Sequence, residues 1–288
     1  MLDPYAHPGV DRKAQLHCHS TGSDGRYPPE AVVERYRQLG FSFVAITDHD
    51  TVTDASRLSD HACCVIPGVE VTVPRPVRPF GPHLGCLFVH RPPQARTAQA
   101  AIWEVVQAGG VAGLNHPSWT GNLWTARWGT SEVRSLRGFH FVEVWNPHSD
   151  PELDTRRWVQ AVRWCGPEHP VAPVAADDFH RDGQLGRGWV VVRVPSVTAA
   201  ALREALLRGA AYATTGPQAA FGVRKGAVWV ESDAGEVRFY RACGRMVHRV
   251  RRGCAQYEPA PQDGFVRVEC HGATGHAWSS AFWVLPDP

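Results

Sequence analysis

The sequence predicts an α/β domain followed by a small antiparallel β module. From residue 14 to residue 217, apolar segments of strand length alternate with amphipathic segments of helix length. This order is typical of parallel strands joined by helical crossovers. From Phe221 onward only short segments of alternating apolar and polar residues remain, as expected of antiparallel strands joined by turns. We place the boundary near residue 218, which divides the chain into residues 1–217 and 218–288.

The segments of the larger domain are assigned from their period and their end signals. Prolines open the predicted helix "PPEAVVERYRQLG" and Gly40 closes it; three more helices are predicted at "TAQAAIWEVVQAGG", "PELDTRRWVQAVRW" and "TAAALREALLRG". "FSFVAIT" is a continuous apolar run, as in a strand buried on both faces. Further strands are predicted at "AQLH", "CCVIPGVEVTV", "HLGCLFV", "VAGLN", "FVEVWN", "VAPVAA" and "WVVVRV".

The strands of the module are predicted at "VWVES", "EVRFYRA", "MVHRVRR", "FVRVECHG" and "AFWVL". The basic run "RACGRMVHRVRR" favours an exposed strand pair over a nucleic-acid patch, because the net charge of the whole chain is only +2. No stretch approaches the ~18 apolar residues of a membrane helix. The N-terminus holds no apolar run typical of a signal peptide, and the eight cysteines form no CxxC pair. We therefore expect reduced cysteines, no membrane partner and a cytoplasmic location.

The stretch "QLHCHSTGSDG" places His17, His19 and Asp24 just after the first predicted strand. In an extended HxH segment both imidazoles point to the same side, so that both can reach one metal ion. Cys18 between them is expected to point away and to pack. The pattern therefore predicts a metal centre near the start of the chain.

Further histidines and carboxylates stand where predicted strands begin or end. They are His49 with Asp48 and Asp50 after "FSFVAI", Glu70 after "VIPGV", His83 before "LGCLFV", His116 after "VAGL", and Asp178 and His180 after "VAPVA". Active sites of α/β proteins are built at the carboxyl ends of strands. The nitrogen and oxygen donors suit zinc, manganese or iron, and the sequence does not select among these metals.

The order and spacing of these motifs resemble the PHP family, named for polymerase and histidinol phosphatase. The resemblance rests on "LHCHSTGSDGRYPPEAVVERYRQLGFSFVAITDHDTV", followed by "GVEV", "HLG", "NHP", "DDFH" and "AAYATTGP", and spans roughly residues 14–217. It implies a distorted (β/α)7 barrel with a centre of two to three divalent cations. The module, which ends in "GHAWSSAFWV", is similar to the tail of a PHP branch that includes carbaryl-hydrolysing enzymes.

The resemblance also implies which side chains hold each cation. One cation would take His17, His19 and Asp178; a second, bridged by Glu70, would take His83 and His116; a third would take Asp24, His49 and His180. Among these residues, Glu70, Asp178 and His180 are the expected catalytic members. Asp48, Asp50 or Asp177 would either orient an imidazole or cap a turn.

These residues suit hydrolysis of a phosphate ester by metal-activated water at a di- or trinuclear centre, since bound cations acidify water and offset phosphoryl charge. The expected substrate is a small phosphomonoester, a nucleotide or an oligonucleotide phosphate ester, so that nucleic acid enters only as substrate. No GxSxG elbow is present, which argues against a serine esterase. Two alternatives stay open: a metal-dependent carboxylic or carbamate ester hydrolase, and a non-catalytic metal-binding module.

Candidates for substrate binding are fewer. The segment "PSWTGNLWTARWG" carries Trp119, Trp124, Trp128 and Arg127, and is either a lid with stacking surfaces and a cation or a loop that packs on the domain. Arg187 is a candidate phosphate contact, and Asn146 is expected to point into the pocket. His140 and His148 are weaker candidates for a leaving-group acid.

Overall fold

The structure, a computed structural model, describes residues 1–75, 80–121 and 126–285. In the larger domain the elements are β1 (Val10–Gln15), α1 (Pro29–Gln38), β2 (Phe41–Ile46), η1 (Ser56–Leu58), β3 (Cys64–Thr72), β4 (His83–Leu87), α2 (Ala98–Gln107), β5 (Val111–Leu114), α3 (Thr130–Ser135), β6 (Phe141–Trp145), α4 (Pro151–Cys165), β7 (Ala172–Ala175), β8 (Trp189–Val194), α5 (Ala199–Arg208) and β9 (Ala211–Thr214). The remaining elements are β10 (Ala219–Arg224), β11 (Ala227–Ser232), β12 (Glu236–Arg241), β13 (Met246–Val250), β14 (Cys254–Tyr257), η3 (Pro261–Asp263), β15 (Phe265–His271), β16 (His276–Ser279) and β17 (Phe282–Trp283).

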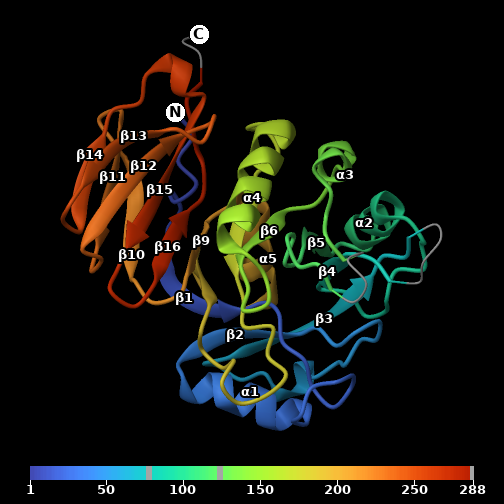
Figure 1. The fold of residues 1–288 in the computed structure, drawn as a ribbon. Helices are drawn as coiled ribbons and strands as arrows, with labels where there is room; N and C mark the ends of the chain where they lie inside the picture. Colours follow the sequence, from blue (N-terminus) through green and yellow to red (C-terminus); the bar gives the residue numbers. More distant parts are fainter. Residues whose placement is uncertain (76–79, 122–125, 286–288) are drawn as a thin grey trace.

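Most strands join one long mixed sheet with the order β13-β12-β15-β16-β9-β8-β1-β2-β3-β4-β5-β6-β7, in which β17 also pairs with β15 (Figure 1). A smaller sheet holds β10, β11 and β14. The order of elements in the larger domain confirms the predicted alternation of strands and helices. Sequence analysis missed the short strands β9, β10, β14 and β16 and the short helix α3.

The expectation of parallel strands throughout the larger domain is wrong at β4 and β8. The pairs β1–β2, β2–β3, β5–β6 and β6–β7 are parallel. Strand β4 is antiparallel to both β3 and β5, and β8 is antiparallel to both β1 and β9. The connection from β3 to β4, residues 73–82, is shorter than the dozen or so residues that a parallel crossover needs. Strand β4 therefore runs back antiparallel to β3.

The mixed α/β class is confirmed, whereas closure into a (β/α)7 barrel is not shown. Among the described residues the hydrogen-bonded path is open, with β7 at one end and β13 at the other. Beyond β1 and β7, the chain makes an isolated parallel bridge between Cys18 and Phe179, where His19 N donates to Phe179 O at 2.9 Å. This bridge draws the segment of His19 to the segment of Asp178 without completing a ladder.

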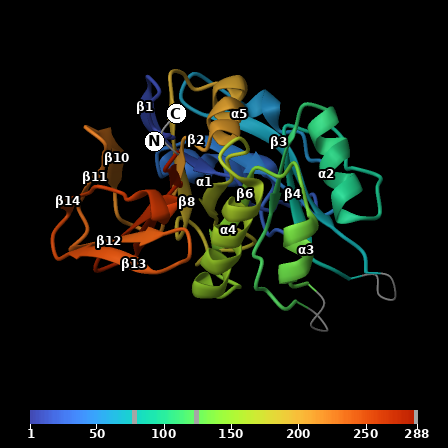
Figure 2. The ribbon, with the colours of Figure 1, turned by 90° about the horizontal axis from the view of Figure 1, so that it is seen from above.

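Helix α4 occupies the middle of the molecule, with the C-terminal strands on one flank (Figures 1 and 2). It begins at Pro151 because the Asp150 side chain accepts hydrogen bonds from the backbone N–H groups of Glu152 and Leu153, and it ends at Gly166, whose φ is 78°. Trp158 on its inner face is fully buried in the core that α4 shares with α2 and the central strands. In the described part of the chain, no helix combines the length and apolar character needed to cross a bilayer.

The module is continuous with the main sheet, because β16 pairs with β9. The boundary near residue 218 stays a prediction. Tyr5, near the N-terminus, fastens this junction: its hydroxyl donates to Ala211 O at 3.0 Å and accepts from Ser280 N at 2.8 Å. Its ring stacks on Phe221 with the centroids 5.5 Å apart. One side chain thus ties together β9, β10 and the C-terminal segment.

Replacing Tyr5 by phenylalanine tests this junction. Tyr5→Phe is expected to lower the free energy of unfolding by about 1–2 kcal/mol, because the Ser280 N–H loses its acceptor in a buried place. Tyr27→Phe is the matched control, since the Tyr27 hydroxyl bonds to Asp182 at the surface, and it should change stability by less than ~0.5 kcal/mol. Urea unfolding followed by circular dichroism measures both. Equal effects would contradict the junction role of Tyr5.

Candidate metal centre

The loop after β1 is held by Asp48. Its carboxylate is fully buried and accepts hydrogen bonds from Ser20 N at 2.7 Å, Ser20 Oγ at 2.6 Å and Ser23 Oγ at 2.8 Å. Gly25 closes the loop, where a Cβ would lie 2.5 Å from the His19 carbonyl carbon. Asp48 therefore organises the turn that carries His19 and Asp24, and it makes no hydrogen bond to an imidazole of the described chain.

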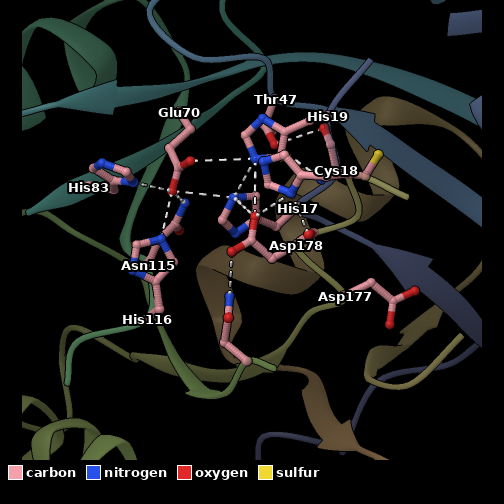
Figure 3. Close-up of polar contacts among 12 residues, drawn as sticks. His17, Cys18, His19, Thr47, Glu70, His83, Asn115, His116, Asp177 and Asp178 are labelled. Carbon is pink, nitrogen blue, oxygen red and sulfur yellow. Dashed lines mark hydrogen bonds and ion pairs between the residues drawn. The ribbon is translucent and has the colours of Figure 1, made fainter. Parts of the chain in front are cut away.

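Glu70, in β3, lies at the centre of the candidate ligands (Figure 3). Its Oε1 lies 3.2 Å from His17 Nε2, 3.1 Å from His83 Nδ1 and 3.0 Å from His116 Nε2. Its Oε2 lies 3.5 Å from His19 Nε2 and 3.2 Å from His49 Nδ1. One carboxylate is therefore surrounded by five imidazoles.

The remaining candidate ligands extend this cluster to one side. Asp178 Oδ1 lies 3.1 Å from His19 Nε2 and 3.3 Å from His17 Nε2. His180 Nε2 lies 3.2 Å from Asp24 Oδ1. All nine sequence-predicted ligands thus come together, and three sets of them have donor atoms within 4.8 Å of one another: His17, His19, Glu70 and Asp178; His49, Glu70 and His83; and His19, Asp24, His49 and His180.

The antiparallel course of β4 explains why His83 stands before a strand and not after one. The first residue of β4 pairs with Thr72 at the carboxyl end of β3, so that His83 reaches the same edge as Glu70. Opposite Glu70 stands Gly85, where a Cβ would lie 2.5 Å from Asn115 Oδ1. A larger residue there would push Asn115 off Glu70.

Backbone strain marks two of the candidate ligands. His116 has a φ of 25° and Asp178 a φ of 47°, although neither is a glycine. Left-handed backbone costs a non-glycine residue of order 1–3 kcal/mol, and it persists only where the surroundings impose it. In this backbone conformation His116 Nε2 reaches Glu70, and Asp178 Oδ1 reaches His17 and His19.

Several groups behind the cluster orient it, and the sequence analysis did not single them out. Glu143 Oε1 lies 2.7 Å from His17 Nδ1, and Glu143 Oε2 accepts from His116 N at 2.7 Å. Asn115 Nδ2 donates to Glu70 Oε1 at 2.9 Å. A signal existed for Glu143, because a lone carboxylate inside the apolar strand "FVEVW" needs a buried partner.

The pKa shifts follow from burial and from these contacts. Burial alone raises the pKa of Glu70, but His17, His83 and His116 outweigh it and hold the pKa well below its usual value. The pKa of Asp178 is likewise held low by His17 and His19 against the effect of burial. Two buried, ionised carboxylates require positive charge beside them.

The donor set fits divalent cations. His17 Nε2 and His19 Nε2 face each other at 3.1 Å, each directed into the same space as Glu70 and Asp178. Among the described residues, the buried Nδ1 atoms of His19 and His116 have no hydrogen-bond partner. His83 Nδ1 makes no hydrogen bond either, although it lies 3.1 Å from Glu70 Oε1. Imidazole and carboxylate donors are the ligands that zinc, iron and manganese share.

The other predicted residues fall in different places. Asn146 donates from Nδ2 to Glu143 at 3.0 Å and to Asp178 at 3.3 Å, and so supports the cluster from behind. The guanidinium of Arg187 lies 6.0 Å from the centroid of the Trp145 ring, outside the cavity lining. Arg127 also stands outside that lining, and Trp124 lies outside the described residues.

Asp177, Asp50 and Cys18 make hydrogen bonds to other parts of the chain and not to the imidazoles. Asp177 accepts from Tyr36 and from three backbone N–H groups of residues 186–188, and burial raises its pKa to about 6. Asp50 Oδ1 accepts from Thr72 N at 2.9 Å. Cys18 points away from the imidazoles, as expected, and its Sγ donates to Ala45 O (Figure 3).

A cavity of about 700 Å³ opens onto the cluster. Two arginines that the sequence analysis did not single out, Arg26 and Arg181, line this cavity together with Trp119. The Trp119 ring centroid lies 4.8 Å from that of His116. His148, which also lines the cavity, is held at 2.9 Å by Gln184 Nε2.

Residues 15–86, which carry the first half of this site, match the PHP domain family. The 5′-3′ exoribonuclease Rnm of Escherichia coli is 44% identical over 64 residues, which is 20% of this chain and 22% of that protein. An error-prone DNA polymerase of Cutibacterium acnes is 37% identical over 112 residues, or 35% of this chain and 10% of the polymerase. The matches thus span about a fifth or less of the relatives' lengths.

One solved structure is similar over nearly the whole chain. It is described as a two-domain protein containing a predicted PHP-like metal-dependent phosphoesterase, from Bacteroides vulgatus. The likeness has a TM-score of 0.56 at 16% identity, and it covers 95% of this chain and 87% of that one. At this identity the likeness shows a shared fold. Because it covers 95% of this chain, the likeness includes C-terminal strands.

Glu143 offers a test of how the cluster is oriented. Glu143→Gln is expected to weaken metal affinity by about 10–100-fold. A glutamine can accept from His17 or from His116 N, but its amide then faces a donor at the other position. Competition with a chelator of known affinity measures the loss. Glu34→Gln is the control, because Glu34 pairs with Arg37 at the surface, and similar affinities in the two variants would contradict this role.

Proposed function

We propose that the protein is a metal-dependent phosphoesterase that hydrolyses a phosphomonoester, a nucleotide or an oligonucleotide phosphate ester. The observation that carries the proposal is the convergence of six imidazoles and three carboxylates on one cavity that is also lined by two arginines. Matches of the PHP domain to an exoribonuclease and a DNA polymerase support a phosphate ester as substrate.

The contacts support a centre of two to three cations. His17, His19 and Asp178 are proposed for one cation, and Glu70 for the bridge to a second, because its two oxygens face different imidazoles. His83 and His116 complete the second position. Asp24, His49 and His180 are proposed for a third, at the more open end of the cluster. Zinc, manganese or iron suits these donors.

Divalent cations bound here would lower the pKa of water and offset the charge of phosphoryl oxygens. The protein's own part is to hold the ligands and to receive the substrate. Among the described residues that line the cavity there is no serine or cysteine, which supports attack by water over a covalent intermediate on such a side chain. Arg26 and Arg181 are proposed to bind phosphate oxygens, and Trp119 to form an apolar wall for the rest of the substrate.

The reaction is tested by comparing two substrate classes on the purified protein with each metal. We expect phosphate release from nucleotides, and little naphthol release from an aryl carbamate. Glu70→Gln should lower the rate by about 10³-fold, the several kcal/mol that the cations supply. Asp50→Asn should cost less than ~10-fold, since an asparagine still accepts from Thr72 N.

Two results would count against this function. Clear cleavage of the carbamate without phosphate release would assign the protein to the carboxylic and carbamate ester hydrolases, for which the aromatic wall of Trp119 is also suited. Equal losses from Glu70→Gln and Asp50→Asn would show that Glu70 is not the bridge.

The two arginines give a separate prediction. Arg181→Ala and Arg26→Ala should each raise KM for a phosphate substrate about tenfold, because each removes a charged hydrogen bond worth roughly 1.5 kcal/mol. Arg187→Ala is the control, since Arg187 stands outside the cavity and its backbone contact to Asp177 survives the change. Steady-state kinetics with a single nucleotide measures all three. An effect of Arg187→Ala equal to the others would contradict the assignment.

A further inference from the structure

A second cleft, of about 650 Å³, lies between the outer face of α4 and the module strands β12, β15 and β16. Its volume falls within the range of small-molecule sites. None of the metal-ligand candidates lines it. Figures 1 and 2 both show these C-terminal strands beside α4.

The sheet turns a polar face toward this cleft. The register pairs Arg238 with Glu269 and Tyr240 with Arg267, so that these four side chains stand on one face. The alternate residues Val237, Phe239 and Val268 belong to the buried module core on the opposite face. A sheet face that packs against a helix is ordinarily apolar, and polar side chains there need partners.

Arg267 is the most buried of the charged groups in the cleft. The residue is 5% exposed, its guanidinium carbon lies 4.2 Å from the centroid of the Tyr240 ring, and its Nη1 donates to Glu269. No acceptor for its buried Nε is found among the described residues. An unpaired buried donor of this kind is costly, and it calls for an acceptor that the described chain does not supply.

The charge of the lining specifies the acceptor. Four guanidiniums line the cleft, and three of them have a carboxylate partner: Arg156 with Glu152, Arg238 with Glu236 and Arg267 with Glu269. Arg163 makes no ion pair with the part of the chain that the structure describes. A phosphate monoester carries a charge of about −1.5 to −2 at neutral pH and offers three acceptor oxygens.

We propose that this cleft binds the phosphate group of a small phosphomonoester, with Arg267 Nε and the Arg163 guanidinium as donors. The planar fork of an arginine suits a phosphate, and Trp278 and His276 leave an aromatic surface for the remainder of the ligand. This site is separate from the metal centre, and it does not depend on the function proposed for that centre.

The two sites meet at the start of α4. His148 lines the metal cavity and Pro151 lines the cleft, three residues further along the chain. The same turn is bonded to the segment after His116, because Ser118 N donates to Asp154 Oδ1 at 2.6 Å and Asp150 N donates to Ser118 Oγ at 2.8 Å. Phosphate would bind at both places, so the test must separate them.

Titration calorimetry of inorganic phosphate into the full chain, loaded with manganese, provides the test. We expect two binding events. Arg267→Lys keeps the charge but loses the Nε donor, and Arg163→Ala removes an exposed cation without disturbing the fold; each should weaken one event about tenfold or more. Glu70→Gln should abolish the other event and leave the cleft event unchanged. Arg249→Lys, on the same sheet but outside the cleft, is the matched control.

Three outcomes would overturn the proposal. The first is a single event, lost in Glu70→Gln and unaffected by Arg267→Lys and Arg163→Ala; Arg267 would then be a strut between Tyr240 and Glu269. The second is equal weakening by Arg249→Lys, which would show that the effect of Arg267→Lys does not come from a donor in the cleft. The third is succinate binding to the cleft as tightly as phosphate, which would make it an unselective anion site.

Discussion

A single buried carboxylate, Glu70, sets the requirement that the rest of the larger domain meets. It is 1% exposed, it is ionised, and it stands within 3.5 Å of imidazole nitrogens from five histidines. A charge in such a place is tolerated only when opposite charge and hydrogen bonds surround it. The strands must therefore bring segments far apart in the sequence to one point. The mixed course of the sheet does so, including the reversal at β4 that aims His83 inward.

The groups behind the cluster matter as much as the ligands themselves. Glu143 fixes the ring of His17 and the backbone of His116 with its two oxygens, while Asp48 fixes the loop that carries His19. Each is a buried carboxylate whose partners hold it in one position. Because cation sites depend on donors held to within fractions of an ångström, we expect these residues to affect cation affinity without being ligands themselves.

The C-terminal strands contact the larger domain in two ways. Through β16 they extend its sheet, and through the cleft they face α4 with arginines instead of apolar side chains. Helix α4 lines this cleft, and His148, shortly before the helix begins, lines the cavity at the metal-ligand candidates. Its first turn, bonded to Ser118, lies at the border of both.

The sequence by itself determined the mixed α/β class, the helices and longer strands, and the nine candidate ligands that the structure brings together. These follow from local patterns, since strand and helix periods are short-range and the ligands stand at strand ends in recognisable motifs. It did not determine the antiparallel course of β8 or the open path of the sheet, because these depend on which segments meet in space. The reversal at β4 did have a local signal, the short connection from β3, which the sequence analysis did not use. Nor did it identify Glu143, Arg26, Arg181 or the Arg267 cleft. Arg26 and Arg181 are ordinary surface arginines in sequence, and Arg267 is one of many on alternating strands. Only the tertiary structure decides which of them line a cavity, because that depends on packing between segments distant along the chain.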